Sequence, residues 1–464
     1  MGGVRLTRAL AVALTLSLVA AAAPSAMASA RAAQEVTATA PPDGTTVVRP
    51  DAEGASVEVV GDRVPDGADP TPDVADDDGT GRADLDELSV VLDDLSRAML
   101  EGDPGRLTGH LDEPDGEVGR AWRQRASNVA GVAFDRYELR VDERLGEVTS
   151  DAVRARYEDE VRVVVVEEEL AVAGHDRDGA GRHRRTLTFV RRDDGWRLSE
   201  ETDGRTLGLS TPVHLWDLGP VASTGDGPVV ALHHPDTPDV EPLVEDTVRA
   251  IATLADRWPA PWSQRVVLVV PSDGDELDEL LDADLHLDDF LAFATATSWT
   301  EPGAHDLVGS RVVVNPDRFG SLGPEVRERV LLHELLHVAT RPLGSAAIPL
   351  WLEEGVAQAL GEQGPSTGTA ARLEALGPQG RRLSRDEEFT AGGRDETHLA
   401  YQRSWSFVDD LVRRHGPPAV AAFYAAVGEA ATTAGTVEHH LDAAARDTFG
   451  TDLEGLVTRW RSGA

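Results

Sequence analysis

The 464-residue chain contains no cysteine. Disulfide bonds and lipid attachment through a cysteine are therefore excluded, and the domains must be stable through their hydrophobic cores alone. Basic residues are also few, because 44 Lys and Arg stand against 82 Asp and Glu and leave a net charge of −38 at pH 7. A surface this acidic repels nucleic acid and anionic membranes, and no basic cluster offsets it. We therefore expect neither as a partner.

Long apolar runs are also lacking, apart from one at the N-terminus over residues 9–23. Arg5 and Arg8 precede this run and small residues follow it at positions 26–30, which is the arrangement of a secretory signal peptide. The run is short for a membrane span, which needs about 20 apolar residues. We predict a signal peptide over residues 1–30, a secreted protein and no stable membrane insertion. Retention of this segment as an N-terminal anchor is the less favoured alternative.

Residues 31–82 are rich in Pro, Gly, Asp, Ala and Thr and have few large apolar side chains. Such a segment cannot bury enough surface to offset the entropy that it would lose on ordering. We therefore predict a disordered acidic linker that precedes the first folded domain.

Residues 83–206 combine helical and strand patterns. A helical spacing of apolar residues opens the segment at 85–100, and a helical or mixed stretch follows at 122–134. Strand-like runs of β-branched and alternating residues then occur at 137–141, 153–157, 161–170 and 186–198. Helices followed by a meander of strands that ends in RRDDGWRL resemble the nuclear-transport-factor-like cone domains. The resemblance implies an α+β accessory domain over residues 83–206.

One run, Val330–Val338 (VLLHELLHV), combines metal-ligand chemistry with helical spacing. His333 and His337 are four residues apart, so on a helix they share one face and can each give a nitrogen to one zinc ion. Glu334 projects from the edge of that face, where it can take a proton from a metal-bound water. The surrounding residues are apolar and predict a buried helix, inside which these polar side chains need a partner such as a metal.

A catalytic zinc ion needs three protein ligands and one open position. The segment Trp351–Ala357 (WLEEGVA) follows Pro349, which suits the first position of a second helix. This helix offers Glu353 and Glu354 as the third ligand, and spacing alone leaves both open.

HELLH followed by WLEEGVA resembles the gluzincin metallopeptidases, in particular the thermolysin-related peptidase MA-like group. The resemblance implies that Glu354, the glutamate before the glycine, is the ligand, and that Gly355 lets the two helices approach closely. It also implies that Tyr401 stabilises the oxyanion, with His398 one turn earlier as the alternative. Thermolysin-like enzymes have an aspartate where this chain has Gln358, whose amide oxygen could still accept a hydrogen bond from a zinc-bound histidine.

Residues 207–464 have strand patterns first and helical patterns after. Predicted strands at 229–232 and 266–270 flank a predicted helix at 242–258, and helices follow from 398 onward. By resemblance to zincins, the run at 311–315 is the sheet edge that pairs with an extended peptide; the alternative is an ordinary internal strand. We predict a zincin-type domain over residues 207–464, with a mixed sheet followed by a helical subdomain.

The sequence therefore predicts a secreted zinc metallopeptidase that acts on a peptide or protein substrate. Zn²⁺ would be held by His333, His337 and Glu354, with Glu334 as the general base and Tyr401 as the second electrophile. The alternative is a non-catalytic zincin-fold binding protein whose N-terminal domain is the functional part. The presence of Glu334 argues against this alternative, because a purely structural zinc site has no use for a base.

Overall fold

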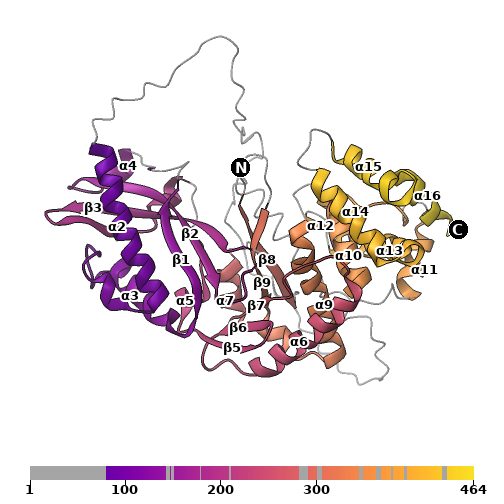
Figure 1. Cartoon of the computed structure of the whole chain (residues 1–464), viewed down its shortest axis with the longest axis horizontal. Coiled ribbons are helices and arrows are strands. Elements are labelled where there is room, and N and C mark those ends of the chain that lie inside the picture. The colour runs from indigo at the N-terminus through magenta and orange to yellow at the C-terminus, as the bar shows by residue number, and fades with distance from the viewer. Residues whose placement is uncertain are drawn as a thin grey trace, which may run out of the picture. The chain divides into compact units, whose positions relative to one another are not determined.

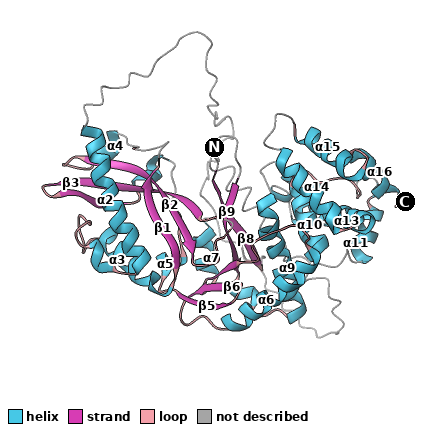
Figure 2. Ribbon diagram, in the orientation of Figure 1, coloured by secondary structure: helices cyan, strands magenta, loops and turns pink. Residues whose placement is uncertain are grey.

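The computed structural model describes residues 80–142, 147, 151–177, 179–207, 211–281, 291–299, 306–343, 348–361, 367–377, 380–390, 394–430 and 436–463. The predicted signal peptide (1–30) lies outside the described residues, as does the predicted linker up to residue 79. Residues Leu85–Ala464 group into one compact unit. Its described residues combine helices and sheets, which confirms the α+β class (Figures 1 and 2).

The first sheet has four antiparallel strands in chain order: β1 (Phe134–Val141), β2 (Val161–Val172), β3 (Gly181–Arg192) and β4 (Gly195–Glu200). Helices α2 (Thr80–Glu101) and α3 (Glu117–Asn128) contribute Leu88, Leu92 and Trp122 to the core beneath it. The predicted helix at 85–100 is thus confirmed, as are three of the four predicted strand regions.

The fourth predicted strand, at 153–157, is wrong. Residues Asp151–Arg154 form the short helix α4, and turn hydrogen bonds from Arg156 and Tyr157 follow it. Val153 and Tyr157 are four residues apart. This spacing fits the alternation of apolar residues in a strand, but it fits one face of a helical turn equally well.

The second sheet is mixed and runs in the order β5 (Ala222–Asp226), β6 (Val229–His233), β7 (Val266–Val270), β9 (Asp306–Val314), β8 (Ala292–Trp299). Strands β6, β7 and β9 are parallel, whereas β5 and β8 are antiparallel to their neighbours. The run at 311–315 is therefore an internal strand, and its interpretation as the sheet edge is wrong. The edge next to it is β8, which forms a hairpin with β9.

The two faces of the second sheet belong to different cores. On β6, Val229 and Ala231 pack in the core formed with α6 (Val240–Arg257) and α9 (Pro324–Thr340). Val230 and Leu232 point the opposite way, into the core under the first sheet. Residues on both sides of the predicted boundary at 207 therefore share a core, while the boundary itself stays a prediction.

Helices make up most of the chain after β9. Following α9 they are α10 (Leu350–Gly361), α11 (Thr367–Ala375), α12 (Asp386–Thr390), α13 (Arg394–His415), α14 (Pro417–Ala430), α15 (Val437–Phe449) and α16 (Leu453–Ser462). Shorter helices are α5 (Leu215–Leu218), α7 (Gly274–Leu281) and α8 (Pro316–Phe319). Within the described part of the chain, no helix has both the length and the apolar sequence needed to cross a membrane.

The close approach of α10 to α13 depends on Gly355. A Cβ atom at this position would lie 2.5 Å from Cγ2 of Val408 and 2.8 Å from the backbone oxygen of Ser404. Both distances are far inside van der Waals contact, so only glycine fits without moving a helix. The sequence predicted that Gly355 allows α10 to approach the HELLH helix, whereas the close contacts at this position are with α13.

Candidate metal centre

Helix α9 carries the HELLH segment and is buried over its last three turns. Pro324 occupies its first turn, after Gly323 at the N-cap, and every residue from Val330 to Thr340 is buried. The helix packs against α6, α10 and β8. The burial of these residues confirms the prediction of a buried helix, which rested on the nearly uninterrupted apolar surface of the helix.

The two histidines of α9 face each other. The Nε2 atoms of His333 and His337 lie 3.0 Å apart, and the ring centroids are 4.8 Å apart in an edge-on arrangement. Burial lowers the pKa of His333 to about 4, although hydrogen bonding to Glu354 opposes this effect. Burial and the nearby charge of Arg341 lower the pKa of His337 to about 3. Both imidazoles are therefore neutral at pH 7, which is the form that binds metal.

Glu354 on α10 completes the group. Its Oε2 atom lies 3.4 Å from Nε2 of His333 and 3.6 Å from Nε2 of His337, and its side chain is fully buried. One ligand atom from each of these residues lies within 4.8 Å of the others, so the group can hold a metal ion. Glu353, in contrast, faces the other nitrogen of His337, with Oε1 3.9 Å from Nδ1. The structure thus brings Glu354 to the paired Nε2 atoms.

The donor set fits a metal ion chemically. Two neutral imidazole nitrogens and one carboxylate oxygen are ligands that zinc and related divalent ions accept. Among the described residues, the recorded ion-pair partners of Glu354 are the two histidines, so no Arg or Lys neutralises this buried carboxylate. Burial raises the pKa of Glu354, against the opposing effects of His333 and the Tyr401 hydroxyl.

Glu334 is held against the edge strand. Its Oε2 atom accepts a hydrogen bond of 2.7 Å from the backbone N–H of Ala294 on β8. Burial raises the pKa of Glu334 well above its usual range, and the adjacent charge of Glu354 raises it further. The carbonyl of Ala294 accepts a 2.5 Å hydrogen bond from Nη2 of Arg341. Both backbone polar groups of Ala294 are therefore bound by side chains from the α9 region.

The structure brings Tyr401 to this group. Its side chain is buried on α13 and packs edge-on against Phe389, with ring centroids 4.9 Å apart. Its hydrogen bond to Glu354 opposes the rise that burial causes in the pKa of that carboxyl group. His398, the alternative, lies one turn earlier with its Nε2 atom 2.9 Å from Nε2 of Gln402.

The hydrogen bond proposed for Gln358 is not formed. Its Oε1 atom is buried, and neither this atom nor Nδ1 of His333 has a hydrogen-bond partner among the described residues. Sequence reasoning also missed Arg341, which binds the strand that holds Glu334. The signal was present, because Arg341 follows His337 by four residues and so continues the same helical face.

Comparison with known proteins yields no identification. No protein-family model matches the chain, and no curated protein matches it. The case for a function therefore rests on the chemistry of the residues described above.

Proposed function

We propose that the protein is a secreted zinc metallopeptidase, with a zincin-type domain over residues 207–464 and a cone-like accessory domain over residues 83–206. The observation that supports this proposal is the buried group of His333, His337 and Glu354, whose ligand atoms lie within 4.8 Å of one another. Two imidazoles and one carboxylate are the protein ligands of many catalytic zinc sites, where a fourth position stays open for water.

A zinc ion held there would lower the pKa of a bound water and polarise a peptide carbonyl. Glu334 is the residue that takes the proton of the attacking water and later delivers it to the leaving amine. The hydrogen bond from Ala294 fixes the direction of this carboxylate before substrate arrives. The Tyr401 hydroxyl donates a hydrogen bond to the oxyanion that develops on the carbonyl.

A peptide substrate has a natural place along β8, the edge of the second sheet. An edge strand can bind an extended peptide as an added strand through its unpaired backbone groups. Because the N–H and C=O groups of Ala294 are already bound by Glu334 and Arg341, pairing takes place at other residues of this edge.

The decisive variant is Glu334→Gln, which keeps the size of the side chain and removes the base. We expect the variant to bind one zinc ion per chain, as the wild type does, and to lose at least about 10³-fold in the rate of casein hydrolysis. Zinc is measured by mass spectrometry, and a chelator serves as the control for metal dependence. Hydrolysis at the wild-type rate by the variant would refute the mechanism, whereas zinc binding without hydrolysis by the wild type would favour the non-catalytic alternative.

A further inference from the structure

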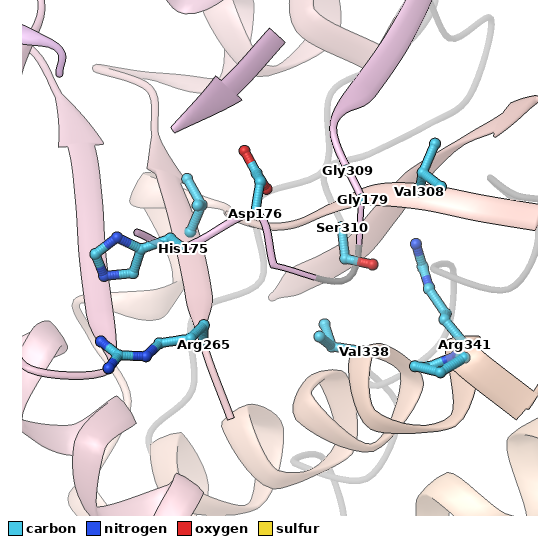
Figure 3. A pocket seen from close by; sticks show the side chains of 11 residues that line it. His175, Asp176, Gly179, Arg265, Val308, Gly309, Ser310, Val338 and Arg341 are labelled. Atoms are coloured by element: carbon cyan, nitrogen blue, oxygen red, sulfur yellow. The ribbon is translucent and has the colours of Figure 1, made fainter. Parts of the chain in front are cut away.

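A second candidate site, with none of the metal ligands in its lining, lies where four segments meet. The loop between β2 and β3 contributes His175, Asp176 and Gly179, and the end of α9 contributes Val338, Arg341 and Pro342. The start of β7 and the first half of β9 form the remaining walls, with Arg265, Val267, Val308, Gly309 and Ser310. They enclose a pocket of about 420 Å³, its open mouth included (Figure 3).

Arg341 is the most informative residue in this pocket. Only 6% of the residue is exposed, and Nη2 is its one nitrogen with a recorded acceptor, the carbonyl of Ala294. Its Nε and Nη1 atoms are buried and have no hydrogen-bond partner among the described residues. Figure 3 shows its side chain extending from the end of α9 toward the strand that carries Val308 and Ser310. A buried guanidinium with two unused donors is costly unless an acceptor binds there.

The other polar groups favour a negatively charged occupant. Arg265 and His175 lie across the pocket from Arg341 in Figure 3. Arg265 donates from Nη1 to the carbonyl of Gly227, a neutral acceptor, and it forms no ion pair within the part of the chain that the structure describes.

The one carboxylate in the lining does not compete for a ligand. Both oxygens of Asp176 accept hydrogen bonds from Arg311, and Oδ2 also accepts one of 2.6 Å from the backbone N–H of Val172. Outside the lining, the charges of Glu353 and Glu334 also act on Arg341, but no hydrogen bond to either occupies its Nε or Nη1 atom among the described residues.

We propose that this pocket binds a small oxyanion, of the carboxylate or phosphate class. The unused donors of Arg341 contact the oxyanion oxygens, and Arg265 supplies positive charge from the opposite wall. A free anion and an acidic side chain of another protein present the same group, so either source satisfies the chemistry. Anion binding here does not require peptidase activity, although Arg341 also binds Ala294, whose N–H holds Glu334.

The test is titration calorimetry of the full chain with inorganic phosphate, at constant ionic strength and with chloride as the reference anion. We expect saturable binding that weakens at least about tenfold in Arg341→Gln and in Arg265→Gln. The matched control is Arg249→Gln, an exposed arginine on α6, which should bind phosphate as the wild type does. If Arg341→Gln fails to fold, the phosphate affinity of Arg265→Gln alone tests the proposal.

Two outcomes overturn the proposal: no saturable binding of phosphate or acetate to the wild type, or equal binding by the wild type and the Arg265 and Arg341 variants. Competition then identifies the source of the oxyanion. If a short glutamate-containing peptide displaces phosphate and its glutamine analogue does not, the natural occupant is an acidic side chain of another protein. If neither peptide displaces phosphate, the natural occupant is a free anion. Because no step measures hydrolysis, failure here leaves the proposed peptidase activity untouched, and the reverse holds too.

Discussion

At the scale of single residues, the three glutamates of the α9 and α10 motifs face different atoms. Glu334 binds the backbone of β8, Glu354 faces the paired Nε2 atoms of the histidines, and Glu353 faces Nδ1 of His337. The sequence left Glu353 and Glu354 open as the third ligand because they are adjacent on one helix. The direction that each side chain takes depends on the packing of α10 against α9, which spacing along one helix does not reveal.

This difference predicts unequal effects of two substitutions. Glu354→Ala removes one of three ligands, so we expect bound zinc to fall below about one tenth of the wild-type amount after dialysis. Glu353→Ala removes a group behind His337 and no ligand, so we expect zinc affinity to weaken by about tenfold to a hundredfold and zinc to remain bound at saturating metal. Zinc per chain, measured at equal protein concentration, distinguishes the two. Loss of metal in the Glu353 variant alone would reverse the assignment.

At the scale of helices and strands, the periodicity of apolar residues predicted the positions of helices well. It predicted the strands, and their order in the sheet, less well. Helix α9 followed from its apolar surroundings and Pro324, and α13 from its amphipathic spacing. Strand β8 was missed, because AFATAT is rich in alanine, which is depleted in strands and weakens the pattern. The order of the strands could not be predicted either, because the pairing of β9 with β7 and β8 depends on contacts between residues that are distant in sequence.

The packing of α10 on α13 predicts the effect of Gly355→Ala. The new Cβ atom would overlap Cγ2 of Val408 and the backbone oxygen of Ser404, so α10 must move and carry Glu354 with it. We expect a loss of about 1–3 kcal/mol in the free energy of unfolding, with weaker zinc binding. Urea denaturation and zinc titration measure both effects. Gly109→Ala is the control, because nothing lies within 4 Å of its Cβ position; equal stability of the two variants would contradict this account.

At the scale of the whole described unit, a buried polar network joins the first sheet to the segment after residue 207. Glu168 on β2 is fully buried, accepts a hydrogen bond from Tyr137, and lies 3.4 Å from Nη2 of Arg185 and 2.8 Å from Nε2 of His214. Arg185 also donates to the carbonyl of Pro212 at 3.4 Å. The burial of Glu168 and Arg185 could not be predicted from the sequence, because the burial of a charge depends on partners from distant segments.

This network predicts how stability depends on pH. Burial by itself would raise the pKa of Glu168, but Arg185 and His214 outweigh it and hold the pKa well below its usual range. Its ionised form therefore stabilises the fold fully above the unfolded pKa of about 4.3, and this contribution is lost as pH falls through the lower folded value.

We expect Glu168→Gln to lower the free energy of unfolding at pH 7 by about 3–5 kcal/mol, because it leaves buried positive charge uncompensated. The difference from the wild type should shrink as pH falls below about 4.3. Urea denaturation at several pH values measures it, with Glu138→Gln, an exposed carboxylate on β1, as the control. A difference that is independent of pH would show that the charge of Glu168 is not the cause.

X-ray absorption spectroscopy at the zinc edge, on the purified wild-type protein, tests the central claim most directly. The account predicts one zinc ion per chain with nitrogen and oxygen ligands at about 2.0–2.2 Å and the multiple-scattering signature of two imidazoles. That signature should fall to one imidazole, or the metal should be lost, in His333→Ala and in His337→Ala. A protein that binds no zinc, or one whose zinc keeps the same imidazole signature in both variants, would contradict it.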